Sequence, residues 1–539
     1  MEEIILRDLF KNHSEIFSGL FLALTVLICF VFTFPLEGIT PRNLAISSAE
    51  NDELIYYYET AGVVDYGLPQ GYFGYTEITA RTGPFGAWSP VLLINFCILG
   101  KLFGWSLTKA VFYNLISLML AVFLFGFFAR PNRTQTVLLA VFLASYTFLM
   151  YGVLSIVPEI TCYSYTIVFM GLLYSAFRDN KTYKIVFMYV IAILLTLMRP
   201  YYAGFLIVAS FFLYRKYGKK SLFCSIPLFI ATFYGFFFIG INFCAGNPIS
   251  GWFSRFVIKV EKNTGNMFMC SGISVALMSG IGAFAKRLLS GLFSMAQQLK
   301  VFFVDRIWGR NYFMFFYIFI LLTVTYFRSD RKKKDDAWLR RIFFLIYYFL
   351  MTIAVALYFS GWVADRHLAE FVVMGIAFTA MEAGKNEDAD KKKSPGFLRP
   401  LAIALEAGLI FSVIMVPNRD REYVTEEFIR DVEETRELLK DEMPVVPTGG
   451  RPSWDNTVLW VYTDTVDGEE VIVPWRALYA IPSGYAFNLV FKDTWFDEGY
   501  DLSSRYLAAA SGSDTEKRCI KWGAKKLADY CGVVIYRLR

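Results

Sequence analysis

The sequence is poor in the residues that build many soluble active sites. It contains only two histidines, His13 and His367, which excludes a metal site made of several histidines. Its eight cysteines form no C-x-x-C pair, and several lie in apolar runs, where cysteine usually packs as a small core residue. No P-loop, HExxH or G-x-S-x-G element occurs in a suitable context. A nucleotide-driven pump is therefore not expected.

Charge is also scarce. Only 19% of the residues are charged, whereas 56% are hydrophobic, including 54 Phe and 33 Tyr. This composition excludes an ordinary soluble enzyme and indicates a polytopic α-helical membrane protein. The net charge of +6 is spread over short loops and forms no nucleic-acid-binding stretch.

Apolar segments recur through residues 1–416. They lie at 17–35, 89–103, 108–128, 135–151, 157–177, 184–198, 201–214, 221–243, 311–327, 342–360, 367–382 and 399–416. The segment 89–103 begins with Pro90 and carries Lys101, so we expect an interfacial helix there. Residues 272–303 form two further short spans or interfacial helices. The sequence therefore predicts about 11 to 13 spans.

Basic residues gather in the loops that we expect on the cytosolic side. These residues are Arg130, Arg133, Arg178, Lys181, Lys184, Arg215, Lys216, Lys219 and Lys220, with the runs 328–341 and 391–393. The resulting topology has a cytosolic N-terminus and an external C-terminal tail. The first external loop is 36–107 and a large external loop is 244–310.

The tail, residues 417–539, has the pattern of a small extracytoplasmic α/β domain. A charged helix is predicted at 424–442 and another at 515–530, with strands at 457–463, 469–479, 486–491 and 532–538. Cys519 and Cys531 would be able to pair in an external domain, although ordinary packing of both thiols is the favoured interpretation.

An acidic pair, Asp52-Glu53, lies in the first external loop, about fifteen residues beyond the apolar run that ends near Pro35. Acidic residues at a helix start satisfy free N–H groups and suit the helix dipole. A carboxylate at a membrane face is also suited to act as a general base for a hydroxyl. Both interpretations remain open, and both can hold at once.

Arginine and histidine stand at external helix ends. Arg366-His367 is a candidate phosphate clamp, because a guanidinium offers several donors to phosphate oxygens. A boundary arginine also snorkels, and for Arg199, which precedes Pro200, snorkelling is the favoured interpretation. The remaining candidates for acceptor or donor-sugar contacts are acidic or basic residues with simpler local explanations: Glu159, Asp305, Arg306 and Glu77.

The layout resembles the GT-C superfamily of polyprenyl-phosphate-sugar glycosyltransferases, in the branch of protein O-mannosyltransferases and aminoarabinose transferases. The resemblance rests on NDELIYYYE at 51–59, GYFGYTE at 71–77 and GPFGAWSPVLLINFCILGKLFGWS at 83–106. It covers roughly residues 1–416, by layout more than by identity. The His-Pro-Pro element of the O-mannosyltransferases is replaced by Trp88-Ser89-Pro90, so a close orthologue of those enzymes is not expected.

The resemblance implies an inverting transfer of a sugar from a polyprenyl-phosphate donor to a glycan, lipid or protein acceptor outside a plasma membrane, of bacterial type. Asp52 would be the base and Glu53 its support, while Arg366, His367 and Arg199 would bind the donor phosphate. Some members use a divalent cation, so Mg²⁺ or Mn²⁺ on Asp52 and Glu159 is possible; no other cofactor is expected. A lipid-linked saccharide flippase or transporter and a glycan polymerase or ligase remain the alternatives.

Overall fold

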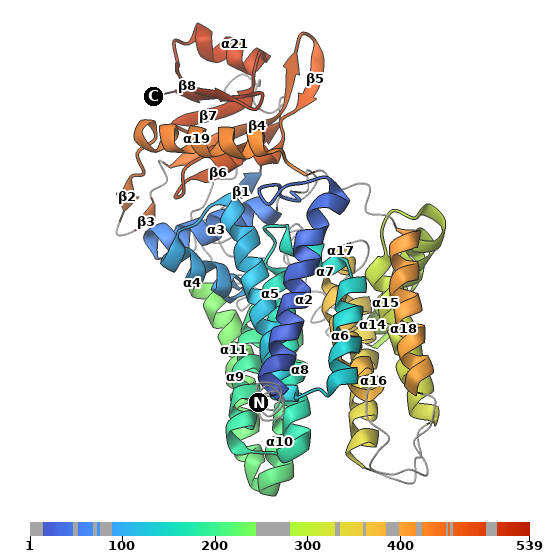
Figure 1. Cartoon of the computed structure of the whole chain (residues 1–539). Helices are drawn as coiled ribbons and strands as arrows, with labels where there is room; N and C mark the ends of the chain where they lie inside the picture. The colour runs from blue at the N-terminus through green and yellow to red at the C-terminus, as the bar shows by residue number, and fades with distance from the viewer. Residues whose placement is uncertain are drawn as a thin grey trace, which may run out of the picture.

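The computed structural model describes most of the chain, and the account below concerns those residues alone. They are 14–46, 52–67, 73–75, 89–243, 281–328, 335–358, 363–383, 398–416, 423–448, 451–452, 456–491 and 504–538. A large helical part is followed by a smaller domain built on a β-sheet, which lies at one end of the helices (Figure 1). The expected mostly helical chain with a small C-terminal sheet is thus confirmed.

Helices dominate the first 415 residues. They are α2 (Ser14–Glu37), α3 (Asp52–Tyr66), η1 (Pro90–Leu93), α4 (Ile94–Phe103), α5 (Leu107–Ala129), α6 (Arg133–Ser145), α7 (Phe148–Val153), α8 (Glu159–Asp179), α9 (Thr182–Met198), η2 (Pro200–Tyr202), α10 (Ala203–Tyr217), η3 (Gly218–Ser221), α11 (Leu222–Phe243), α14 (Ile281–Lys300), η4 (Val301–Asp305), α15 (Arg310–Arg328), α16 (Asp336–Tyr358), α17 (Val363–Ala383) and α18 (Leu398–Met415). Local sequence determines where some of these helices begin. For example, Asn132 and Gln135 form a capping box at the start of α6.

Five of the described helices are long and apolar enough to cross a membrane. They cover Glu15–Glu37, Leu107–Ala129, Glu159–Asp179, Arg310–Phe327 and Asp336–Leu357. Shorter apolar helices cover Pro90–Phe103, Arg133–Ser145, Thr182–Met198 and Pro400–Met415. The count of 11 to 13 spans therefore remains a prediction. One expected span is divided, because the segment 135–151 forms α6 and the short α7 with a break after Ser145.

Glycines allow α2, α5 and α8 to pack at close backbone distance. A Cβ atom at Gly126 of α5 would lie 2.6 Å from the Cα of Gly19 in α2. On the other side of α5, a Cβ at Gly171 of α8 would lie 2.9 Å from the Cα of Phe125. Small residues at such crossings permit the close van der Waals packing that holds helices together in lipid.

Replacing Gly126 by leucine should force α2 away from α5. Adding methylene groups to a packed core costs about 1–3 kcal/mol, and contact with backbone atoms puts this change at the upper end. The matched control is Gly282→Leu in α14, where an added Cβ meets nothing within 4 Å. Titration with SDS in mixed micelles should show a lower free energy of unfolding for G126L and little change for G282L. Equal stability of the two variants would contradict the close crossing.

The basic helix ends gather at the end of the helical part that lies away from the sheet (Figure 1). Arg130 forms an ion pair of 3.4 Å with Glu15 at the start of α2. Arg178, near the end of α8, donates to the carbonyl of Ala129 over 2.9 Å. Lys216, near the end of α10, also reaches the loop that follows α8. This grouping supports the predicted alternation of loops, while the sidedness of the membrane remains a prediction.

The smaller domain contains a seven-stranded sheet in the order β1-β6-β4-β7-β9-β8, with β5 paired to β4. Its strands are β1 (Phe73–Tyr75), β4 (Thr457–Val466), β5 (Glu469–Ile472), β6 (Ala486–Phe491), β7 (Tyr506–Ala510), β8 (Lys525–Tyr530) and β9 (Val533–Arg537). A two-stranded sheet pairs β2 (Pro447–Thr448) with β3 (Arg451–Pro452). The strands β1, β6, β4 and β7 run parallel, whereas β9, β8 and β5 are antiparallel to their neighbours.

Alternating residues of the central strand β4 cover two faces of the sheet. Val458 and Trp460 join the large core that includes α19 (Glu426–Glu442) and η6 (Trp475–Ala480). Leu459 and Val461 instead pack with Cys519 of α21 (Asp514–Lys521). The sheet is therefore covered on both sides, as a parallel arrangement requires.

Two expectations for the tail need correction. The predicted helix 515–530 ends at Lys521, because Gly523 adopts a φ of +72° beyond it and residues 525–530 then pair with β9 as β8. The predicted strand 469–479 stops at Ile472, since Pro474, which has no N–H, precedes the 3₁₀ helix η6. The strand β7 was not expected at all. Cys519 and Cys531 are free thiols, so a disulfide between them is ruled out.

Candidate functional site

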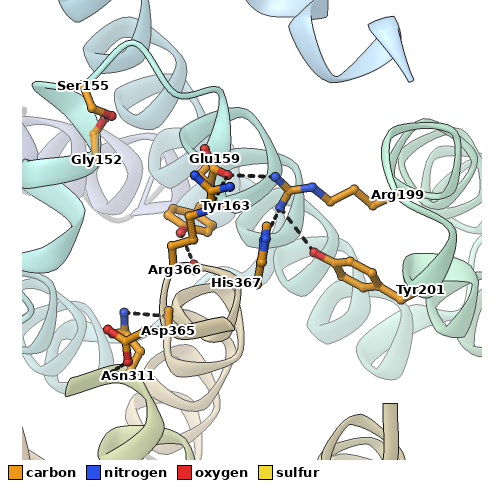
Figure 2. Close-up of polar contacts among 10 residues, drawn as sticks. All are labelled: Gly152, Ser155, Glu159, Tyr163, Arg199, Tyr201, Asn311, Asp365, Arg366 and His367. Carbon is orange, nitrogen blue, oxygen red and sulfur yellow. Dashed lines mark hydrogen bonds and ion pairs between the residues drawn. The ribbon is translucent and has the colours of Figure 1, made fainter. Parts of the chain in front are cut away.

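Four of the residues singled out from the sequence lie together where three helices meet. Glu159 is the first residue of α8, and Arg199 is the C-cap of α9. Arg366 and His367 lie in the first turns of α17, across from those two helices. Figure 2 shows the Arg199 and Arg366 side chains turned toward the Glu159 carboxylate, with His367 beside the Arg199 guanidinium. We call Glu159, Arg199, Arg366 and His367 the charged cluster.

Arg199 is the centre of the charged cluster. Its Nη2 lies 2.8 Å from Oε1 of Glu159, and its Nη1 lies 2.9 Å from Nδ1 of His367 (Figure 2). Since a guanidinium only donates, Nδ1 of His367 is the acceptor, and the proton of the neutral imidazole is therefore on Nε2. Tyr201 also accepts from Nη1, over 3.3 Å.

Arg366 approaches the same carboxylate from α17. Its Nε lies 3.7 Å from Oε1 of Glu159, and 19% of its side chain is exposed. The hydroxyl of Tyr163 donates to the Arg366 carbonyl over 2.6 Å, which ties α8 to the start of α17. Arg366 is therefore the more accessible of the two guanidinium groups.

Burial changes the interpretation of Arg199. The residue is 0% exposed, and Glu159 is 2% exposed. The favoured expectation that Arg199 snorkels to a lipid boundary is wrong, because its guanidinium turns inward to Glu159 and His367 instead. Pro200 ends α9 at this point, so Arg199 takes an extended conformation that releases it from the helix. A buried charge of this kind requires a partner, and Glu159 supplies it.

Glu370 is a site residue that sequence reasoning missed. It lies one turn beyond His367 in α17, is fully buried, and interacts electrostatically with Arg199 and Glu159. Neither of its carboxylate oxygens accepts a hydrogen bond from any residue that the structure describes. Glu370 thus places a buried carboxylate inside the apolar run 367–382 of α17. The signal was the His-x-x-Glu spacing inside an otherwise apolar run, which puts both residues on one helix face.

A polar network fixes the start of α17. Oδ1 of Asp365 accepts from the backbone N–H groups of Asn311 and Tyr312, over 2.9 and 3.1 Å, at the N-terminus of α15. The Asn311 side chain donates back to the Asp365 carbonyl over 2.9 Å, and Tyr146 donates to Asn311 over 2.6 Å. Arg366 therefore follows a residue that is held by the N-terminus of α15.

Helix α3, which Asp52 begins, lies between the charged cluster and the sheet domain. The structure does not describe the side chain of Asp52. Tyr56, one turn later, interacts electrostatically with Arg199. Helical geometry places the backbone positions 52, 56 and 59 on one face of α3. Glu53 is buried and interacts with Tyr479 of the sheet domain.

The opposite face of α3 is attached to the sheet domain. The Tyr58 hydroxyl donates to the carbonyls of Leu478 and, over 2.5 Å, Ile481. The Tyr57 ring lies 4.9 Å from the Arg436 guanidinium. Burial raises the pKa of Tyr57 to about 12, and the positive charge of Arg436 only partly opposes this. The phenol of Tyr57 is therefore neutral at physiological pH.

The other predicted residues do not join the charged cluster. Asp305 and Arg306 are exposed at the end of η4, and within the described chain they form no ion pair with each other. Glu77 lies outside the described residues. No group of three or more metal-binding side chains occurs in the described ranges. A divalent cation on Asp52 and Glu159 therefore remains a prediction.

Comparisons with known proteins include a similar solved structure. No protein-family model matches the chain, and no curated protein matches it. The crystal structure of ArnT from Cupriavidus metallidurans in the apo state aligns with a TM-score of 0.41 and 11% identity. The alignment covers 96% of this chain and 97% of ArnT. A TM-score this low does not establish a shared fold, so the likeness assigns neither a family nor an activity.

Proposed function

We propose that the chain is a membrane glycosyltransferase that moves a sugar from a polyprenyl-phosphate donor to an acceptor outside the membrane. The observation that carries this proposal is the charged cluster. Two guanidinium groups approach the Glu159 carboxylate, and the His367 imidazole accepts from one of them, at the start of α8 and α17 and the end of α9. Such a group of donors suits a phosphate that is attached to a lipid, because the lipid chain can remain in the bilayer.

In this proposal the reaction is a single inverting displacement. An acceptor hydroxyl attacks the anomeric carbon, and the bond between that carbon and the phosphate oxygen breaks. Asp52 takes the hydroxyl proton, and the electron pair of the broken bond leaves on the polyprenyl phosphate. Arg366 would stabilise the charge that develops on the phosphate, while the Nε2–H of His367 would donate a further hydrogen bond. The resemblance of residues 51–59 to the GT-C loop supports this role of Asp52.

Glu159, Arg199 and Glu370 would act as positioning residues. Arg199 is fully buried and donates hydrogen bonds to Glu159, His367 and Tyr201. Its bond to Nδ1 of His367 orients the imidazole. Arg366, which is less buried and only 3.7 Å from the same carboxylate, is the group that a phosphate would approach. This refines the expectation that both arginines contact the phosphate directly.

Replacing Asp52 by asparagine should lower sugar transfer by about 100-fold or more, because general base catalysis contributes about 10²–10⁴-fold. The matched control is Glu37→Gln, a half-buried acid that bonds to Tyr151 and lies outside the charged cluster. Transfer would be measured by mass spectrometry of the envelope glycan in a deletion strain that expresses each variant at equal level. Full transfer by D52N would overturn the base role.

A lipid-linked saccharide transporter is the second candidate, and buried Glu370 is the observation that favours it. Ionisable residues inside membrane helices commonly mark transport pathways. A transporter forms no new glycosidic bond, so the two candidates differ in their product. If the purified protein releases free polyprenyl phosphate from a polyprenyl-phosphate sugar only when an acceptor is present, the transporter is excluded.

A further inference from the structure

A second site lies on the far side of α3, between the helices and the sheet domain. It is a pocket of about 600 Å³ that α3, the segment before α5, α19 and residues 481–483 enclose. A pocket of this volume is large enough for a ligand of one to a few rings. None of the residues in the charged cluster lines it.

One wall of this pocket is aromatic and rigid. Trp105 is half-buried, its Nε1 donates to the Tyr57 carbonyl over 3.1 Å, and its ring lies 5.5 Å from that of Tyr57. Phe96 also packs against the Trp105 ring, at 5.1 Å between centroids, and Tyr113 stacks on it at 6.2 Å. A fixed indole of this kind offers a flat surface for a sugar ring or a cation.

The opposite wall is charged, and carboxylates outnumber cations. Four acidic side chains line the pocket against two basic ones: Asp65, Glu433, Glu434 and Glu437, with Arg436 and Lys440. Both cations already have partners in the protein. Arg436 donates to the Tyr479 carbonyl over 3.0 Å and lies against the Tyr57 ring, and Lys440 pairs with Glu437 at 2.6 Å. Among the carboxylates, Glu437 pairs with Lys440 and Glu434 lies 4.0 Å from Arg430, so the side chains that line the pocket still carry a net negative charge.

We propose that this pocket binds a saccharide that carries free amino groups. Vicinal hydroxyls suit the carboxylate oxygens as donors, and the sugar ring suits the indole face of Trp105. Ammonium groups on the sugar would pair with Glu433 and Glu434, whereas a phosphorylated sugar would be repelled by them. The ring of an amino sugar matches the aromatic wall, and its ammonium groups match the acidic wall. An acyclic polyamine lacks the ring, and a neutral sugar lacks the positive charge.

Helix α3 separates the pocket from the charged cluster. Tyr57, Ala61 and Asp65 follow at intervals of four residues and line the pocket, on a face turned by about 100–180° around the helix axis from the position of Tyr56. A helix about 10 Å thick therefore separates the two sites. The saccharide would be a part of the acceptor remote from the reacting hydroxyl, a role that rests on the proposed transfer. Binding of the saccharide in the pocket does not depend on the proposed transfer.

The test is calorimetric titration of the purified full chain, in detergent, with three probes. Short glucosamine oligomers should bind, while the fully N-acetylated oligomers and spermine should bind at least about tenfold more weakly. The variants Trp105→Ala and Glu433→Gln/Glu434→Gln should each weaken binding of the glucosamine oligomer by about tenfold or more. The control, Glu469→Gln/Glu470→Gln, removes the same charge from the exposed strand β5 and should bind like the wild type.

Several outcomes would overturn the proposal. These are no binding of the glucosamine oligomer, equal binding of spermine, equal binding of the N-acetylated oligomer, and unchanged binding by both pocket variants. D52N separates this proposal from the proposed transfer, because it should retain binding while it loses transfer. If the wild type binds the glucosamine oligomer and transfers no sugar, the proposed function fails and the pocket assignment stands.

Discussion

Replacing Arg366 by glutamine should weaken the binding of undecaprenyl phosphate by about 10- to 100-fold. A hydrogen bond to a charged group contributes about 1.5–3 kcal/mol, and glutamine removes the charge and the outer nitrogens while it keeps a polar side chain. Arg366 is the guanidinium of the charged cluster that remains 19% exposed, so a phosphate can reach it without breaking the Arg199–Glu159 pair. Native mass spectrometry of the full chain titrated with undecaprenyl phosphate measures the change.

Arg341→Gln provides a closely matched control. Arg341 lies 3.7 Å from Glu382 and its side chain is 14% exposed, which reproduces the distance and burial of the Arg366–Glu159 pair. It lies near the start of α16, outside the charged cluster. R341Q should bind undecaprenyl phosphate like the wild type. An equal loss of affinity in R341Q and R366Q would mean that general destabilisation, and not a phosphate contact, explains the result.

Replacing Glu159 by glutamine should produce the largest loss of stability. The exchange leaves the fully buried Arg199 without its closest negative partner, and breaking a buried ion pair costs about 3–5 kcal/mol. Titration with SDS in mixed micelles would report the free energy of unfolding. Glu406→Gln is the control, because Glu406 bonds to the neutral hydroxyl of Ser145 and should lose less than about 1.5 kcal/mol.

The double variant E159Q/R199Q tests whether the unpaired charge of Arg199 causes the loss of stability in E159Q. Removal of both members of a buried pair costs much less than removal of one, because no uncompensated charge remains. The double variant should therefore be more stable than E159Q alone. If E159Q is as stable as the wild type, or if the double variant loses the sum of both single effects, the ion pair is not the source of stability.

The general architecture could be predicted from the sequence. Long apolar runs predict membrane helices, and basic loops predict the cytosolic side, which remains a prediction; Arg130 and Arg178 do contact neighbouring helix ends. The individual candidates Arg199 and Arg366-His367 were also recognisable, because charged residues at apolar helix ends require an explanation. Their roles remain proposals.

The adjacency of these residues could not be predicted. Arg199 and His367 are 168 positions apart, and only the packing of α8, α9 and α17 brings them within 2.9 Å. For the same reason the ion pair of Arg199 was mistaken for snorkelling. A single sequence shows that an arginine ends a helix, whereas the direction of its side chain depends on tertiary contacts.

Two further features were missed because each looks ordinary in the sequence. Glu370 stands in an apolar run, and its neighbours alone do not reveal that it faces Arg199. The three-residue strand β1 comes from the first predicted loop and pairs with β6 of the distant sheet, so Phe73 lies opposite Phe487. Short strands of this kind depend on their partner, and local propensity does not reveal them.

The most direct test of the account is mass spectrometry of lipids extracted from a strain in which the gene is deleted. If the chain consumes a polyprenyl-phosphate sugar, that lipid should accumulate in the deletion strain, and its mass should identify the donor sugar. Expression of the wild type should remove it, whereas expression of R366Q or D52N should leave it. Lipid extracts that are the same with and without the chain would contradict the proposed transfer.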